Sequence, residues 1–180
     1  MSRKSTLFTA AVELKAVDPE AVTALQALKE TMPARAPEEL RRYVLWQVMM
    51  PQETDPSEAE AMLRRYEDIV NPNKHRLIML DGGVEGLAGN DLLWVPVRVH
   101  NLDDTVSEGW LSLLAGAGYP VAGLDVSVLW LLGYPSDISP EAALDKAGAV
   151  AVTRSRREGL LGNPVSQRVT VGDAALRGAL

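Results

Sequence analysis

The sequence predicts an α+β protein made of two similar units in tandem, each with the order strand-helix-strand-strand-helix-strand (βαββαβ). Three observations predict this fold class. Two kinds of segment occur in turn along the chain: some have alternating apolar residues, as in strands, and others have apolar residues at helical spacing. A glycine-rich segment divides the chain near its middle. Short motifs of the first half recur in the same order in the second half.

Composition limits the classes of protein to which the chain can belong. Its 180 residues allow one large domain or two small ones, and 47% apolar with 23% charged residues is typical of a folded chain. A net charge of −6 argues against a nucleic-acid surface. The absence of cysteine excludes disulfides and thiolate chemistry. No run of about 18 apolar residues occurs, so we expect no membrane contact and a cytoplasmic protein.

The elements of the first unit follow from local signals. Alternating apolar and polar residues predict a strand at the beginning. Each of the two helices is expected to begin at an Asp-Pro pair, in which the aspartate caps the helix and the proline occupies its first turn. The expected strands cover 8–14, 40–50 (two strands joined by a turn, or one long bent strand) and 75–80, and the helices run from Asp18-Pro19 to Met32 and from Asp55-Pro56 to Val70.

The second unit repeats this order after a segment that contains four glycines within residues 81–90 and is typical of a flexible linker. Pro96 falls inside a predicted strand, which predicts a bulge or an unpaired position. We divide the chain into a first unit (1–81), a linker (82–90), a second unit (91–172) and a frayed tail (173–180). The expected elements of the second unit are strands over 92–100, 121–132 and 165–171, a short helix over 106–114, and a helix from Ser139-Pro140 to Leu161.

Three matches between the halves indicate an internal repeat. Residues 44–46, Val-Leu-Trp, recur as residues 128–130, which is 84 residues later. The helix-starting Pro56 recurs as Pro140 at the same offset, and Asn71-Pro72 recurs as Asn163-Pro164, 92 residues later. Three matches in the same order, on the same expected elements, favour duplication.

The split βαβ, or ferredoxin-like, arrangement is the candidate topology for each unit. Its helices cover one face of a four-stranded sheet and leave the other face bare. Two tandem units with pseudo-twofold packing could bury that face by stacking sheet on sheet, or they could join their edge strands.

The motifs of this chain resemble a known family, the PurS subunit of phosphoribosylformylglycinamidine synthase. Residues 160–165, Leu-Leu-Gly-Asn-Pro-Val, are similar to the segment with which that family ends its last helix, and Ile69-Val70-Asn71-Pro72 is a weaker version. The family also begins its first helix after Asp-Pro, as at Asp18-Pro19, and has a Gly-x-Pro-Val segment like residues 118–121.

The resemblance implies a function in purine biosynthesis. PurS-like proteins are small non-catalytic dimers that hold a glutaminase subunit and an ATP-dependent synthetase subunit together, and a tandem chain would be a covalent form of that dimer. It implies no activity for the chain alone, no cofactor and no metal, with a homo-oligomer as a further option. The candidate residues, for partner contact or for structure, are Asp18, Pro19, Asn71, Pro72, Asn163 and Pro164.

Two alternatives remain open. The chain could be a stand-alone regulatory module that binds a small metabolite between two ferredoxin-like units. It could also be a small enzyme of the dimeric-barrel type, which would need a polar cluster in a sheet-lined cavity. For that, the sequence offers only His75, His100 and scattered carboxylates, so we rank it last. Without ligand-like spacing around the histidines a metal site is a weak hypothesis, and Asp103-Asp104 is interpreted as part of a turn.

Overall fold

The computed structural model describes residues 4–89, 91–155 and 158–176. Asn90 of the predicted linker and residues 177–180 of the predicted tail lie outside these ranges. The elements are β1 (Ser5–Leu14), α1 (Pro19–Thr31), β2 (Glu39–Pro51), α2 (Pro56–Arg64), β3 (His75–Leu80), β4 (Leu92–Asn101), α3 (Thr105–Gly116), β5 (Gly123–Pro135), α4 (Pro140–Ala151), β6 (Gln167–Val171) and the 3₁₀ helix η1 (Gly172–Leu176).

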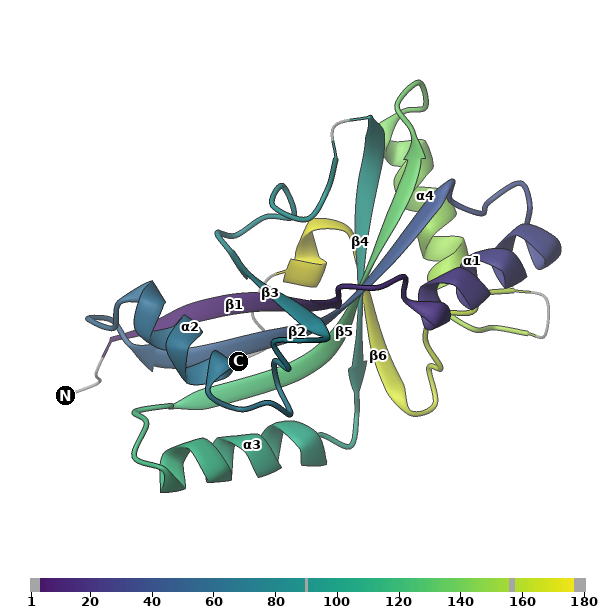
Figure 1. Cartoon of the computed structure of the whole chain (residues 1–180). Helices are drawn as coiled ribbons and strands as arrows, with labels where there is room; N and C mark the ends of the chain where they lie inside the picture. Colours follow the sequence, from purple (N-terminus) through teal and green to yellow (C-terminus); the bar gives the residue numbers. More distant parts are fainter. Residues whose placement is uncertain (1–3, 90, 156–157, 177–180) are drawn as a thin grey trace.

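The strands form one six-stranded antiparallel sheet in the order β3-β1-β2-β5-β4-β6 (Figure 1). The α+β class is therefore confirmed. The two halves are joined edge to edge, because β2 pairs with β5 from Glu39 opposite Gly133 to Met49 opposite Gly123. Each strand of the first half has its counterpart at the mirrored place in the second half, so the strand order is symmetric about the β2–β5 pair.

Each half contributes three strands to the sheet and not the four expected for a βαββαβ unit. The segment expected to hold the second and third strands is one continuous strand, β2, and β5 is its counterpart. Residues 40–50 contain no glycine, proline, asparagine or aspartate that could form a turn, and they are rich in residues that favour strands. The long-strand alternative is the one that the structure adopts.

The four α-helices of the described residues cover the same face of the sheet, in two pairs (Figure 1). One apolar cluster joins α2 and α3 to the second half of β2 and includes Trp46 and Val48. The other joins α1 and α4 to the far end and includes Leu40, Trp130 and Leu132. Each cluster combines one helix from each half, so the cores of the two halves interlock. No helix in the described part of the chain is both long enough and apolar enough to span a membrane.

Helices α1, α2 and α4 begin as the sequence predicts. Asp18, Asp55 and Ser139 each stand before a proline and accept a hydrogen bond from a backbone N–H of the first turn. Hydrogen bonds from the hydroxyl and the N–H of Ser57 lower the pKa of the Asp55 carboxyl. Helix α3 differs, because Asp104 occupies its N-cap position without capping it through the side chain.

The helix expected to run to Leu161 ends ten residues earlier, at Ala151. Val152 already has an extended backbone. The chain then folds back toward the end of the helix, where Gly162 forms a parallel bridge with Val152. Gly159 permits this return, because it has a φ of +75° and a Cβ there would lie 1.7 Å from the carbonyl oxygen of Val152. Helix α2 likewise ends early, at Arg64, although Val70 is buried in the turn that follows it.

The face of the sheet without helices, here called the open face, is covered by two segments expected to be flexible. Leu87 of the predicted linker is buried against it, and its carbonyl oxygen accepts hydrogen bonds from Arg41 at 2.8 Å and Tyr43 at 3.4 Å. The beginning of the predicted tail is the 3₁₀ helix η1, in which Ala175 is fully buried (yellow in Figure 1). The linker and η1 therefore bury side chains of the open face, so no second sheet needs to stack on it.

Pro96 keeps its place in the ladder with β5, opposite Leu131, without a bulge. The neighbouring strand β6 ends opposite Val97. Pro96 is therefore paired on the β5 side, so the expected bulge does not occur; among the described residues the position lacks a strand partner only on the β6 side.

Candidate functional site

A cluster of polar side chains lies on the open face where β4 and β5 meet the beginning of α3. Alternation along β4 places Arg98 and His100 on this face, and alternation along β5 does the same for Asp125 and Ser127. Asp104, just before α3, completes the set. We call these five residues the polar cluster.

Arg98 and Asp125 form an ion pair at the buried end of the polar cluster, with side chains that are only 5% and 3% exposed. Nε of Arg98 donates a hydrogen bond to the Ser127 hydroxyl at 2.8 Å, and that hydroxyl donates to Oδ2 of Asp125 at 3.2 Å. The carboxylate is therefore held through Oδ2, while Oδ1 faces His100. A buried pair with these additional hydrogen bonds has a fixed geometry.

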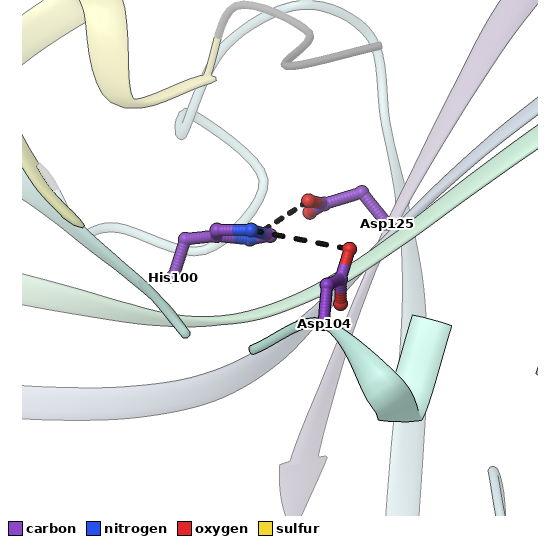
Figure 2. Close-up of side chains that lie close together, drawn as sticks. All are labelled: His100, Asp104 and Asp125. Carbon is purple, nitrogen blue, oxygen red and sulfur yellow. Dashed lines mark ion pairs between the residues drawn. The ribbon is translucent and has the colours of Figure 1, made fainter. Parts of the chain in front are cut away.

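His100 lies between two carboxylates (Figure 2). Its Nδ1 is 2.9 Å from Oδ1 of Asp125, although the geometry of this contact is not that of a hydrogen bond. Its Nε2 is 3.9 Å from Oδ2 of Asp104, which is beyond hydrogen-bond distance. The His100 side chain is 17% exposed, so the imidazole remains accessible from the Asp104 side.

The fold itself does not require a charged pair at this position. Arg98 lies opposite Leu129 in the same way as Ala11 lies opposite Leu45, and Leu45 and Leu129 are counterparts in the repeat. The first half thus has an alanine where the second half has a buried arginine. The sheet forms with either residue, and the polar cluster is a feature of the second half alone.

Gln47 extends the polar region into the first half. It lies directly opposite Asp125, and side chains of residues paired in this way point to the same face. The residue is completely buried, and its Nε2 donates to the carbonyl oxygen of Leu176 at 3.2 Å. Its Oε1 has no hydrogen-bond partner within the described ranges. A buried carboxamide oxygen without a partner is costly.

A cleft of about 960 Å³ also opens on this face, between the predicted linker and η1. Three carboxylates line it, from Asp81, Glu85 and Asp173. Trp94 lines it as well; its Nε1 donates to the carbonyl oxygen of Gly89 at 2.9 Å, and the guanidinium of Arg41 lies 4.5 Å from its ring centroid. The residues lining the cleft come from both halves of the chain.

The two Asn-Pro motifs form matching turns. The side chain of Asn71 accepts a hydrogen bond from the N–H of Asn73 at 3.0 Å, and that of Asn163 accepts one from the N–H of Val165 at 3.0 Å. The N–H of each asparagine also donates to the side chain four residues ahead, His75 or Gln167. The turns lead into β3 and β6, so they lie at opposite edges of the sheet.

Asp18 and Pro19 begin α1, and they too have a structural role. Besides capping, the Asp18 carboxylate lies 3.6 Å from the Arg42 guanidinium, whose Nε is 3.0 Å from Glu20. Nζ of Lys15 donates to the carbonyl oxygen of Pro72 at 2.6 Å, which places Asp18 and the first Asn-Pro turn in one region. Pro164 lies at the opposite edge, so the six candidate residues do not form one site.

Sequence reasoning missed the polar cluster. His100 and Asp104 stand four residues apart, but Asp125 comes 21 residues after Asp104 and meets them only through strand pairing. An imidazole flanked by two carboxylates can transfer a proton or bind a cation. The arrangement supports a binding or positioning role on the open face, and no family model or curated protein matches the chain.

Proposed function

We propose that this chain is a non-catalytic bridging subunit, a covalent counterpart of a PurS-like dimer. In this proposal its halves are ferredoxin-like repeats related by an approximate twofold axis. It holds together the glutaminase and synthetase subunits of a phosphoribosylformylglycinamidine synthase. The observation that carries the proposal is the pair of matching Asn-Pro turns at opposite edges of one sheet. Such a chain has two similar surfaces that face apart, as a bridge between two partners needs.

The turn before β6 supports a contact with a partner. Val165 follows Asn163-Pro164 and is 86% exposed, although its N–H is fixed by the turn. A large apolar side chain held in the solvent by a rigid turn is a candidate anchor for an interface. The equivalent residue in the first turn is Asn73, which is polar. The two surfaces therefore have similar backbones and different side chains, which suits two different partners.

Co-purification tests the proposal directly. The untagged chain is mixed with the glutaminase and the synthetase, with glutamine and a non-hydrolysable ATP analogue present, and the mixture is analysed by sedimentation velocity. We expect one complex that contains all three chains. If the chain sediments alone under these conditions, the proposal is wrong.

The Val165→Asn variant locates the contact, because it makes the second turn resemble the first. We expect at least tenfold weaker binding of one partner, since an interface anchor contributes about 2 kcal/mol or more. The control is Leu113→Asn, which alters another exposed aliphatic side chain, on α3, that is 46% exposed. Equal affinities of both variants for the partners would place the interface elsewhere.

The cleft favours a second candidate function, a module that binds a small metabolite. Its volume of about 960 Å³ suits a small organic ligand, and its three carboxylates favour a positively charged one. Thermal-shift screening against amino acids, amines and nucleotides tests this function, because a ligand that binds the folded state raises the melting temperature. A shift that disappears in the Asp81→Asn variant would support the module, and no shift with any compound would exclude it.

A further inference from the structure

We propose that the polar cluster binds a divalent first-row transition metal ion through His100, Asp104 and Asp125. The ligating atoms of these three side chains all lie within 4.8 Å of one another. They come from β4, the beginning of α3 and β5, so the ion would fasten three elements of the second half together. The inference is independent of the proposed bridging function.

The three side chains lie close enough to meet at one ion after small movements, although they do not yet have the spacing of bound ligands. Two ligands bound at about 2.1 Å from one metal ion lie about 3–3.5 Å apart. Nδ1 of His100 is 2.9 Å from Asp125 and Nε2 is 3.9 Å from Asp104, and neither contact is an aligned hydrogen bond. Small side-chain rotations bring one nitrogen and both carboxylates to one ion, which replaces two imperfect contacts by three coordination bonds.

The residues around Asp125 hold its carboxylate in the orientation that a metal ligand needs. Arg98 and Ser127 hold Oδ2, which leaves Oδ1 directed toward His100. Outer partners of this kind fix the orientation of metal-binding carboxylates. The two carboxylates outweigh the single guanidinium of Arg98, so the site carries a net negative charge that attracts a cation.

Two buried polar atoms in this region of the open face have no hydrogen-bond partner in the described part of the chain. They are Nδ1 of His100 and Oε1 of Gln47, and Gln47 is completely buried directly opposite Asp125. A metal ion would use a lone pair of the imidazole, and a water molecule bound to the ion could donate to the carboxamide oxygen. These bonds would offset the free-energy cost of burying the imidazole nitrogen and the carboxamide oxygen without partners.

Asp104 supplies an independent observation. The N-cap residues of α1, α2 and α4 all accept hydrogen bonds from their helices, whereas Asp104 does not. Its carboxylate points toward His100 instead (Figure 2). An N-cap bond normally stabilises a helix, so its absence at Asp104 indicates that the carboxylate has another use.

The donor set selects the class of metal. One imidazole and two carboxylates are borderline-to-hard ligands, which suit Zn²⁺, Co²⁺ or Mn²⁺ better than the thiophilic Cu⁺ or the oxygen-preferring Ca²⁺. Three protein ligands also leave room for water in the coordination sphere. The partial exposure of His100 and Asp104 provides a path from solvent.

The test uses the full, untagged chain after treatment with a chelator. Zn²⁺ binding is measured by isothermal titration calorimetry, and Co²⁺ binding by its visible absorption, which reports nitrogen and oxygen ligation. We expect one ion per chain. We expect His100→Gln and Asp104→Asn to weaken binding at least tenfold, and the Co²⁺ spectrum to change with each.

Matched controls keep the test specific. His75→Gln changes the other histidine and retains an acceptor for the N–H of Asn71, and Asp103→Asn changes the exposed neighbour of Asp104. Both controls should bind Zn²⁺ like the wild-type chain, and circular dichroism verifies that every variant is folded. The proposal is overturned if the wild-type chain binds neither ion. It is also overturned if the controls lose as much affinity as the cluster variants.

Discussion

Val44 and Val128 lie directly opposite each other where β2 meets β5, and each is the counterpart of the other in the sequence repeat. A residue that pairs with its own counterpart marks the point about which the two halves are symmetric. The edge that β2 offers to β5 is therefore complementary to a second copy of β2. Several properties of the chain follow from this relationship.

The first half alone, residues 1–89, should form a homodimer through β2. Without β5, a strand of 13 residues would expose its backbone groups, and a second copy can pair with them in the register that centres on Val44. Sedimentation equilibrium should give twice the mass of the fragment. Val44→Pro, which removes a backbone donor at the centre, should reduce dimerisation. A folded monomeric fragment would show that β2 does not recognise itself.

Arg98→Met should lower the free energy of unfolding by about 3–5 kcal/mol, because it leaves the Asp125 carboxylate buried without its cationic partner. The control is Arg76→Met, which removes the exposed ion pair with Glu13 and should cost at most about 1 kcal/mol. Urea unfolding measures both. The double variant Arg98→Met with Asp125→Asn should recover part of the loss, and equal costs for the two single variants would contradict the buried pair.

Stability should fall as the pH rises above 10, the ordinary pKa of tyrosine. Burial raises the pKa of Tyr134, so the folded chain keeps this phenol neutral at a pH where the unfolded chain releases the proton. The stabilisation is complete below the unfolded pKa and is lost as the pH rises toward the folded one. Burial raises the pKa of Tyr43 as well.

Absorbance at alkaline pH and urea unfolding measure this effect together. The Tyr134→Phe variant should lose part of the pH dependence, and it should cost about 1 kcal/mol at neutral pH for the hydrogen bond to the carbonyl oxygen of Arg35. If Tyr134→Phe has the same pH dependence as the wild-type chain, the phenol is not kept neutral by burial.

Two glycines should respond to alanine in opposite directions. Gly148→Ala should stabilise the chain by about 0.5–1 kcal/mol, because this glycine lies inside α4 and nothing lies within 4 Å of the added Cβ. Gly159→Ala should destabilise it by more than about 1 kcal/mol, because φ is positive and the Cβ would overlap the Val152 carbonyl. Melting curves of the two variants give the comparison, and equal shifts would contradict it.

Much of the fold could be predicted from local sequence patterns. Asp18, Asp55 and Ser139 were recognised as helix starts because an N-cap followed by proline acts within one turn. The repeat motif around Val44 located the long central strands, because its residues favour strands. The expectation of a bulge at Pro96 was wrong, because the residue keeps its place opposite Leu131 in the ladder with β5.

Other features depend on contacts that no local pattern contains. Leu87 belongs to a glycine-rich segment that looks flexible, and it is buried only because the open face offers it an apolar partner in Tyr43. Leu161 fits a helical stripe, yet the chain leaves the helix at Val152 and returns. In both cases tertiary packing outweighs a weak local preference.

The sequence by itself determined the α+β class, the places of most helices and strands and the presence of matching motifs in the two halves, since these follow from periodicity, turn residues and caps; it did not determine that each half has three strands and not four. Only the tertiary structure decided that the halves share one sheet and that His100 meets Asp104 and Asp125. Strand pairing and register bring distant residues together through backbone hydrogen bonds, and these bonds hardly depend on which side chain each residue carries. The sequence alone therefore does not specify which polar residues become neighbours.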